Sequence, residues 1–149
     1  MNFYKAMHWK EHYALGHAPM DATHQEFTQL TRQLAKTETA GKEAVATAME
    51  ALLRHSEQHF AQEDYWMAES GFPPVQCHAR EHQRVLASLQ NVLRRVKNGH
   101  SALGKTAARE LESWFERHVA TMDTALARHM RQVDYTPAAL PETPDICVR

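Results

Sequence analysis

Residues 55–74, HSEQHFAQEDYWMAESGFPP, contain the spacing that decides the fold. His59 is followed four residues later by Glu63, and four residues make about one turn of an α-helix. The two side chains therefore share one helical face, beside Phe60 and Trp66. Leu would pack better there, because an imidazole or a carboxylate is buried at low cost only when it is hydrogen-bonded or liganded. The pair therefore indicates a polar site inside a helical protein.

Four segments carry apolar residues at helical spacing, and each stops at a glycine, a proline or a short polar turn. The predicted helices cover residues 20–38, 43–70, 75–97 and 103–131. Gly71 suits the C-terminal cap of the second helix. No segment alternates with the period of two that is typical of a strand. We therefore expect an all-α fold, an up-down-up-down four-helix bundle with short connections.

The chain of 149 residues is long enough for one domain with a proper core. Residues 1–18 have aromatic side chains but no clear period, and we expect them to form an N-terminal arm. The bundle should occupy residues 19–131, beginning with Pro19 in a first helical turn. Residues 132–149 contain prolines and predict an extended C-terminal tail.

The composition excludes several classes of protein. The 17 basic and 18 acidic side chains nearly balance, so we expect no nucleic-acid or anionic-membrane partner. No apolar run is long enough to span a membrane, and the N-terminal sequence is too polar for a signal peptide. We therefore expect a cytoplasmic protein. The content of 11 histidines is unusual and suggests a metal site.

Antiparallel packing of the four predicted helices brings chemistry-bearing side chains from all of them to the same end of the bundle. Each residue advances an α-helix by about 1.5 Å, which places these side chains in one slab. The candidate metal ligands are His24, His59, Glu63, His78, His82, His118 and Asp123. Nothing in the order of the sequence requires this coincidence.

Five imidazoles and two carboxylates suit iron, manganese or zinc better than calcium or a zinc finger. Seven protein ligands are too many for one ion of ordinary geometry. They suit two ions that the carboxylates bridge, with the imidazoles as terminal ligands.

The spacing of His118 and Asp123 does not fit a regular α-helix. Five residues correspond to about 140° around the helix axis, and Met122 would share the face of His118 instead. Either Asp123 reaches the site sideways, or the helix contains a π-type bulge whose i→i+5 pattern realigns the pair.

The order H…HxxxE…HxxxH…HxxxxD resembles that of the hemerythrin family, over roughly residues 9–130. Trp114, four residues before His118, and Asp64, directly after Glu63, add to the resemblance. The matching segments are MDATHQEF around His24, HFAQE from His59, HAREH from His78 and HVATMD from His118.

The resemblance implies a non-heme diiron protein that binds O₂ or another small diatomic ligand reversibly. His78, His82 and His118 would hold one iron, and His24 and His59 the other. Glu63 and Asp123 would bridge both ions together with a solvent-derived oxo or hydroxo group. O₂ would bind at the open position of the two-histidine iron, and the protein would be a carrier, a store or a sensor rather than an enzyme.

Apolar residues about one turn from a ligand are expected to wall the O₂ pocket. They are Met20, Phe27, Phe60, Met67, Leu86, Trp114, Phe115 and Met122. Three alternatives stay open at this point: a diiron peroxidase, oxidase or nitric-oxide-handling enzyme, a zinc or mixed-metal helical protein, and a metal-free helical interaction module.

Overall fold

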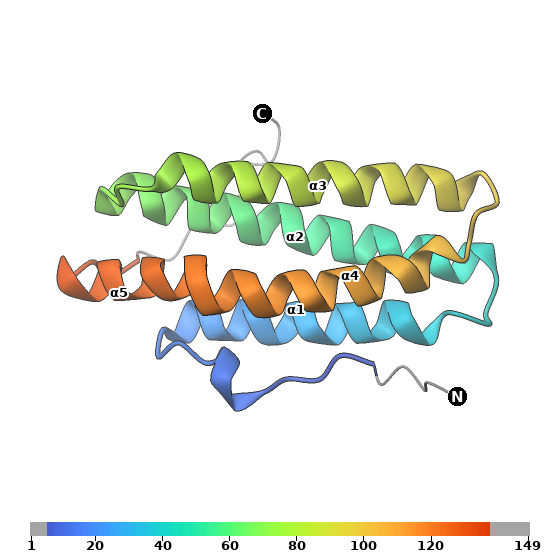
Figure 1. Cartoon of the computed structure of the whole chain (residues 1–149), viewed down its shortest axis with the longest axis horizontal. Coiled ribbons are helices and arrows are strands. Elements are labelled where there is room, and N and C mark those ends of the chain that lie inside the picture. Colours follow the sequence, from blue (N-terminus) through green and yellow to red (C-terminus); the bar gives the residue numbers. More distant parts are fainter. Residues whose placement is uncertain (1–5, 138–149) are drawn as a thin grey trace.

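The computed structural model describes residues 6–137, and every regular element within them is helical. A short 3₁₀ turn, η1 (Glu11–Tyr13), precedes the long helices. The remaining elements are α1 (Ala18–Lys36), α2 (Lys42–Ser70), α3 (Val75–Lys97), α4 (Leu103–His118), the π-helical η2 (Val119–Asp123) and α5 (Thr124–Gln132). Figure 1 shows that α4 and α5 form one continuous rod, so the fourth rod of the bundle runs from Leu103 to Gln132.

The four rods form the up-down-up-down bundle that the sequence predicts. Each long helix packs against its neighbours in sequence, and contacts between α1 and α4 close the ring. The predicted segments agree closely with the observed ones, except that α1 begins and ends about two residues earlier than expected. His17 causes the early start, because its Nδ1 accepts the Met20 backbone N–H at 3.2 Å and caps the helix.

The turn after α2 sets which side chains of α2 and α3 meet. Gly71 has φ of 70°, a left-handed conformation that glycine adopts without steric cost. The N–H of Phe72 then donates to the Met67 carbonyl at 2.9 Å, which ends α2 as a Schellman motif does. Because α3 begins at Val75, Glu63 and His78 lie at comparable depths from the same end of the bundle.

The core consists of two apolar clusters on either side of the candidate ligands along the bundle axis. The larger cluster contains Leu52 and Leu111, which lie about two turns before His59 and His118 respectively. The smaller cluster closes the end of the bundle beyond the candidate ligands. It comprises Met20, Trp66, Met67, Phe72, Leu126, Ala127 and Met130.

Of the two conformations that the spacing of His118 and Asp123 left open, the fourth rod adopts the π-type bulge. Residues 119–123 are π-helical, and the helix is α-helical on both sides. The wider turn brings His118 and Asp123 onto one face, with His118 Nε2 3.1 Å from Asp123 Oδ1. Thr124 donates its hydroxyl to the Val119 carbonyl at 2.7 Å and so satisfies one backbone acceptor within the irregular segment.

The N-terminal arm packs along the bundle as far as it is described. Met7 and Tyr13 are buried and belong to the larger core cluster. The Tyr13 ring meets Phe115 edge to face at 5.0 Å. At the other terminus, Tyr135 packs against the smaller cluster. The rest of the expected tail, from residue 138, and residues 1–5 of the arm lie outside the described residues, and the domain boundaries stay a prediction.

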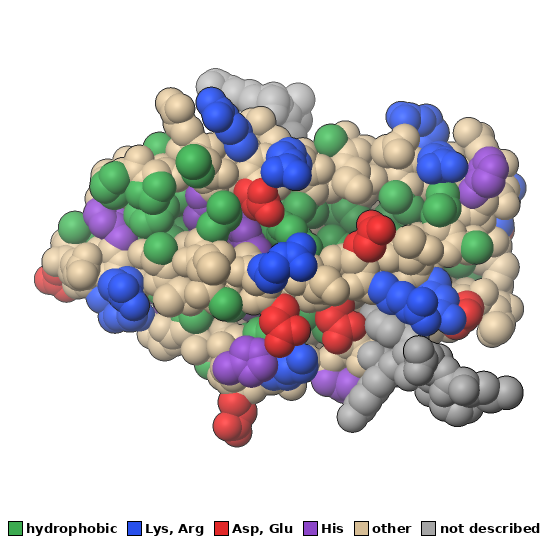
Figure 2. Space-filling model, in the orientation of Figure 1, with side chains coloured by type: hydrophobic (Ala, Val, Ile, Leu, Met, Phe, Trp, Pro, Cys, Tyr) green, Lys and Arg blue, Asp and Glu red, His purple; other side chains and the backbone are tan. Residues whose placement is uncertain are grey.

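The surface in Figure 2 mixes charges of both signs over the face that α3 and α4 form, as the balanced composition predicts. Apolar side chains follow the furrow between the two rods. Within residues 6–137, no helix combines the length and the apolar character that crossing a bilayer requires.

Gly104 allows α4 to approach its neighbours closely, and this contact generates a test of the packing. A Cβ at position 104 would lie 2.5 Å from Cγ1 of Val45, whose branched side chain is stiff. Overpacking of this kind costs about 1–3 kcal/mol, while Ala favours a helix over Gly by about 1 kcal/mol. Gly104→Ala should therefore lower the free energy of unfolding by up to about 2 kcal/mol, measured by urea denaturation. The control Ser113→Ala, at an exposed position of the same helix, should stay within about 0.5 kcal/mol of the parent.

Candidate metal centre

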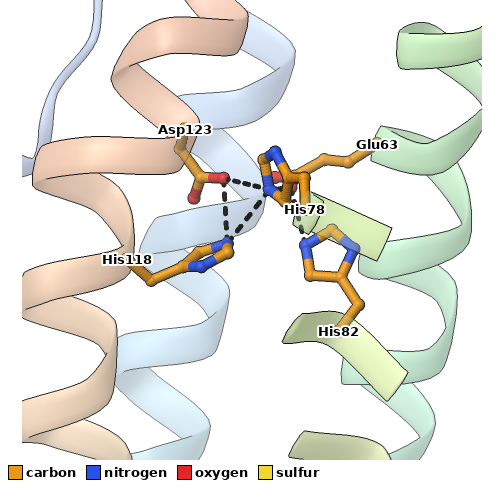
Figure 3. A group of neighbouring side chains, drawn as sticks. All are labelled: Glu63, His78, His82, His118 and Asp123. Atoms are coloured by element: carbon orange, nitrogen blue, oxygen red, sulfur yellow. Dashed lines mark hydrogen bonds and ion pairs between the residues drawn. The ribbon is translucent and has the colours of Figure 1, made fainter. Parts of the chain in front are cut away.

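All seven predicted ligands converge inside the bundle, and each is at most 4 % exposed. They come from all four rods, as the sequence predicts: His24 from α1, His59 and Glu63 from α2, His78 and His82 from α3, and His118 and Asp123 from the fourth rod. Figure 3 shows five of them pointing toward one another. Their donor atoms form two groups, and the first contains Glu63, His78, His82, His118 and Asp123. The second contains His24, His59 and Glu63.

Glu63 divides its two oxygens between these groups. Its Oε2 lies 2.7 Å from His59 Nε2 and 3.3 Å from His24 Nε2. Its Oε1 lies 3.2 Å from His82 Nε2 and 3.4 Å from His78 Nε2. A carboxylate with one oxygen in each of two donor groups has the arrangement of a bridging ligand.

Asp123 repeats this division from the opposite side. Its Oδ2 lies 3.2 Å from His24 Nε2, and its Oδ1 lies 3.0 Å from His78 Nε2 and 3.1 Å from His118 Nε2. Neither Asp123 oxygen has the geometry of a hydrogen bond with any described group. The atoms are close without being aimed at one another, which suits donors that face a common centre.

The donor spacing fits a metal ion. His78 Nε2 and His118 Nε2 are 3.1 Å apart, so these two atoms and Asp123 Oδ1 form a nearly equilateral triangle. Metal–ligand bonds of about 2.1 Å at right angles separate neighbouring donors by about 3 Å. The triangle therefore has the dimensions of one face of an octahedron. All five imidazoles also present the same atom, Nε2, to the carboxylates.

In the metal-free protein the carboxylates and imidazoles compensate one another. Burial by itself raises the pKa of Glu63, but the neighbouring imidazoles, His59 foremost, hold it well below its usual range. Burial likewise lowers the pKa of His24, yet Asp123 and Glu63 outweigh this effect and raise it to about 10. The same carboxylates raise the pKa of His78 to about 9. For His59, burial dominates and lowers the pKa. Ionised carboxylates and deprotonable imidazoles are the ligands that iron and zinc require.

Aromatic rings enclose the imidazoles. Phe60 stacks on His82 at 4.1 Å with an interplanar angle of 3°, and Trp114 stacks on His118 at 4.4 Å. Phe115 meets the His24 ring edge-on at 5.3 Å. These contacts replace water around the rings and restrict their rotation, which fixes where the nitrogens point.

The predicted pocket residues do not all reach this enclosure. Phe27, Phe60, Trp114 and Phe115 contact ligand rings, and Met20 and Met67 belong to the smaller core cluster. Leu86 and Met122 are only partly buried and belong to neither core cluster. Met122 lies in the π-helical segment, whose wider turn presents Asp123 on the face that an α-helix would give to Met122.

Sequence reasoning missed Phe72, whose ring lies 6.3 Å from His78, because it falls in a turn where no periodicity marks the inward face. It also assigned no role to His17 and His129, and both are half-buried. His17 caps α1, and His129 Nε2 donates to the Ser70 carbonyl at 2.9 Å.

Comparisons with known proteins agree with this geometry. The profile of the hemerythrin HHE cation-binding domain matches residues 15–130. A bacteriohemerythrin from Ralstonia nicotianae is 39% identical over 124 residues, which are 83% of this chain and 88% of the relative. A crystal structure of a hemerythrin point mutant superposes with a TM-score of 0.79 at 18% identity, and a crystal structure of another point mutant superposes with a TM-score of 0.79 at 19% identity. Each match covers 85% of this chain and 98% of the other, which shows the shared fold. The chain therefore belongs to the hemerythrin family.

Proposed function

We propose that this protein binds two iron ions and, through them, binds O₂ or another small diatomic ligand reversibly, as a carrier, a store or a sensor. One observation carries the proposal: both buried carboxylates place one oxygen in each of two imidazole groups. Glu63 and Asp123 would thus hold the two ions as a pair. The name bacteriohemerythrin of the relative from Ralstonia nicotianae supports the same reading.

The imidazoles divide unequally between the two positions. His78, His82 and His118 would hold one ion, and His24 and His59 the other. The second position therefore has one protein ligand fewer and would be the place where a small molecule can enter. When bound, an iron pair supplies the two electrons that reversible O₂ binding draws from the site.

The residues around the ligands would protect this chemistry. Met20, Phe27, Phe60, Met67 and Phe115 are each at most 1% exposed. Their apolar side chains leave little room for water, which otherwise solvates departing anions and favours irreversible oxidation. Trp114, which stacks on His118, would close part of the outer side of the pocket, whereas Leu86 and Met122 are only partly buried. This enclosure favours a binding protein over an enzyme that must exchange polar substrates.

Cycles of air and vacuum on the iron-loaded, anaerobically reduced protein test the function. A visible absorption band should appear in air and disappear under vacuum over repeated cycles, with about two irons per chain. Irreversible bleaching together with turnover of peroxide or nitric oxide would instead identify the rival enzyme. Zinc in the isolated protein and no response to air would contradict the proposal.

Substitution of one ligand tests the assignment of the ions. His118→Ala removes a terminal ligand from the three-histidine group and takes away one of the three imidazoles that lie close to Asp123. Iron content should fall from about two per chain to about one or less, and the apparent melting temperature should fall, because bound metal adds to folding stability. The control His100→Ala, at an exposed position, should retain the iron content and the melting temperature of the parent. Unchanged iron in His118→Ala would contradict the assignment.

Proton release provides an independent test of the ligand set. The metal-free protein carries protons on His24 and His78 at pH 7.5, because their pKa values are about 10 and about 9. A metal ion binds only the deprotonated imidazole, so loading should release at least about two protons per chain. Zinc titration in weak buffer with a pH indicator measures this release.

The raised pKa values of His24 and His78 also determine how metal affinity and the stability of the metal-free protein depend on pH. Metal affinity should rise with pH up to about 10, as the competing protons leave. In the metal-free protein, the raised pKa values contribute stability that is complete below the ordinary imidazole pKa of 6.5 and is lost as the pH rises through about 9–10. A release of no protons at pH 7.5 would contradict the role of both histidines.

A further inference from the structure

One imidazole of the centre differs from the other four in what its outer nitrogen contacts. His82 Nδ1 lies 2.9 Å from Asp64 Oδ1. The outer nitrogens of His24, His59, His78 and His118 have no hydrogen-bond partner among the described protein groups. We propose that Asp64 is a positioning residue that makes the two metal positions unequal, by orienting His82 and strengthening its bond to the ion of the three-histidine group. This inference rests on the two-ion site proposed above.

The contact with Asp64 selects the tautomer of His82. A carboxylate oxygen can only accept a hydrogen bond, so His82 Nδ1 carries the proton and donates it. In the neutral ring, which is the form that binds a metal ion, the lone pair is then on Nε2, which faces Glu63 Oε1 at 3.2 Å (Figure 3). Because Phe60 stacks on the same ring with an interplanar angle of 3°, the ring can neither tilt nor flip without losing a contact. His82 is thereby preset for coordination through Nε2.

The position of Asp64 follows from its neighbour in sequence. Consecutive residues of an α-helix point about 100° apart. With Glu63 fully buried toward the centre, Asp64 points past the edge of α2 toward α3, where its side chain is 39% exposed. One oxygen can therefore bind His82 while water reaches the carboxylate, and the negative charge is carried without the cost of full burial.

The charge of Asp64 has an electronic consequence for the ion that His82 would bind. A carboxylate that accepts the Nδ1 proton draws it away from the ring, which makes Nε2 a stronger electron donor. A ligand atom that donates electrons more strongly stabilises the more highly charged, oxidised state of the metal ion. The ion held by His78, His82 and His118 should therefore bind more tightly and have a lower reduction potential than it would without Asp64. The ion at His24 and His59 receives no such support from the described residues.

Two substitutions separate the charge of Asp64 from its hydrogen bond. Asp64→Asn keeps an acceptor oxygen and removes the charge, whereas Asp64→Ala removes both. Glu69→Gln is the matched control, because it removes one negative charge from an exposed position of the same helix. Asp64→Glu is the conservative variant and should restore part of the effect.

The zinc-loaded protein supplies the readouts, independently of iron or O₂. In the parent, one histidine Nδ1 proton should resonate far downfield in the proton NMR spectrum. It should move upfield in Asp64→Asn and be lost to exchange with water in Asp64→Ala. In competition with a chelator, one of the two zinc ions should bind about 10- to 100-fold more weakly in both variants, and the other should be unchanged. With iron, the reduction potential should shift to a more positive value.

The outcomes distinguish this inference from the proposed function. If Asp64→Asn weakens both ions equally, or if Glu69→Gln has the same effect, the role of Asp64 is overturned while the two-ion site stands. If the parent holds two zinc ions and shows the Asp64 effects but its iron form does not cycle with O₂, the O₂ function fails and the role of Asp64 is upheld. An unshifted Nδ1 proton in Asp64→Asn would sink the inference by itself.

Discussion

Two buried carboxylates shared among five imidazoles are the interaction on which the rest of this structure depends. Glu63 and Asp123 are fully buried, and charges in such surroundings persist only with compensating partners. The imidazoles supply those partners in the metal-free chain, and they lower the pKa of both acids despite burial. The bundle must therefore bring all four rods into one register at this level, because a shift of any rod would leave an acid uncompensated.

The π-helical turn shows what this register requires of the backbone. A π-helical turn interrupts regular α-helical hydrogen bonding and is rare in helices. Here it moves Asp123 onto the face of His118 and allows its two oxygens to reach both imidazole groups. The irregularity is thus located where the chemistry needs it, and the α-helix resumes at Thr124 to pack Leu126 and Met130 into the end of the core.

The two apolar clusters and the unequal donor groups connect the fold to its chemistry. The larger cluster separates the centre from one end of the bundle, and the smaller one closes the other end. Stacked rings hold His82 and His118 in place on the three-histidine side. A rigid position with three imidazoles beside one with two imidazoles would suit the proposed pair of ions, of which the second would bind the small ligand.

The sequence by itself determined the helices, their order and the seven polar residues that meet at the centre. His and carboxylate residues at helical spacing can be recognised in a sequence because burial is costly for them unless they have partners. The spacing of His118 and Asp123 even restricted the fourth rod to two conformations, of which tertiary structure selected the bulge. Only the folded chain showed that Phe72 reaches His78, that Met7 and Tyr13 complete the core, and that Asp64 contacts His82. These contacts join residues from turns, arms and helix edges, where no periodicity indicates the inward side and where the packing of separate segments decides which side chains meet.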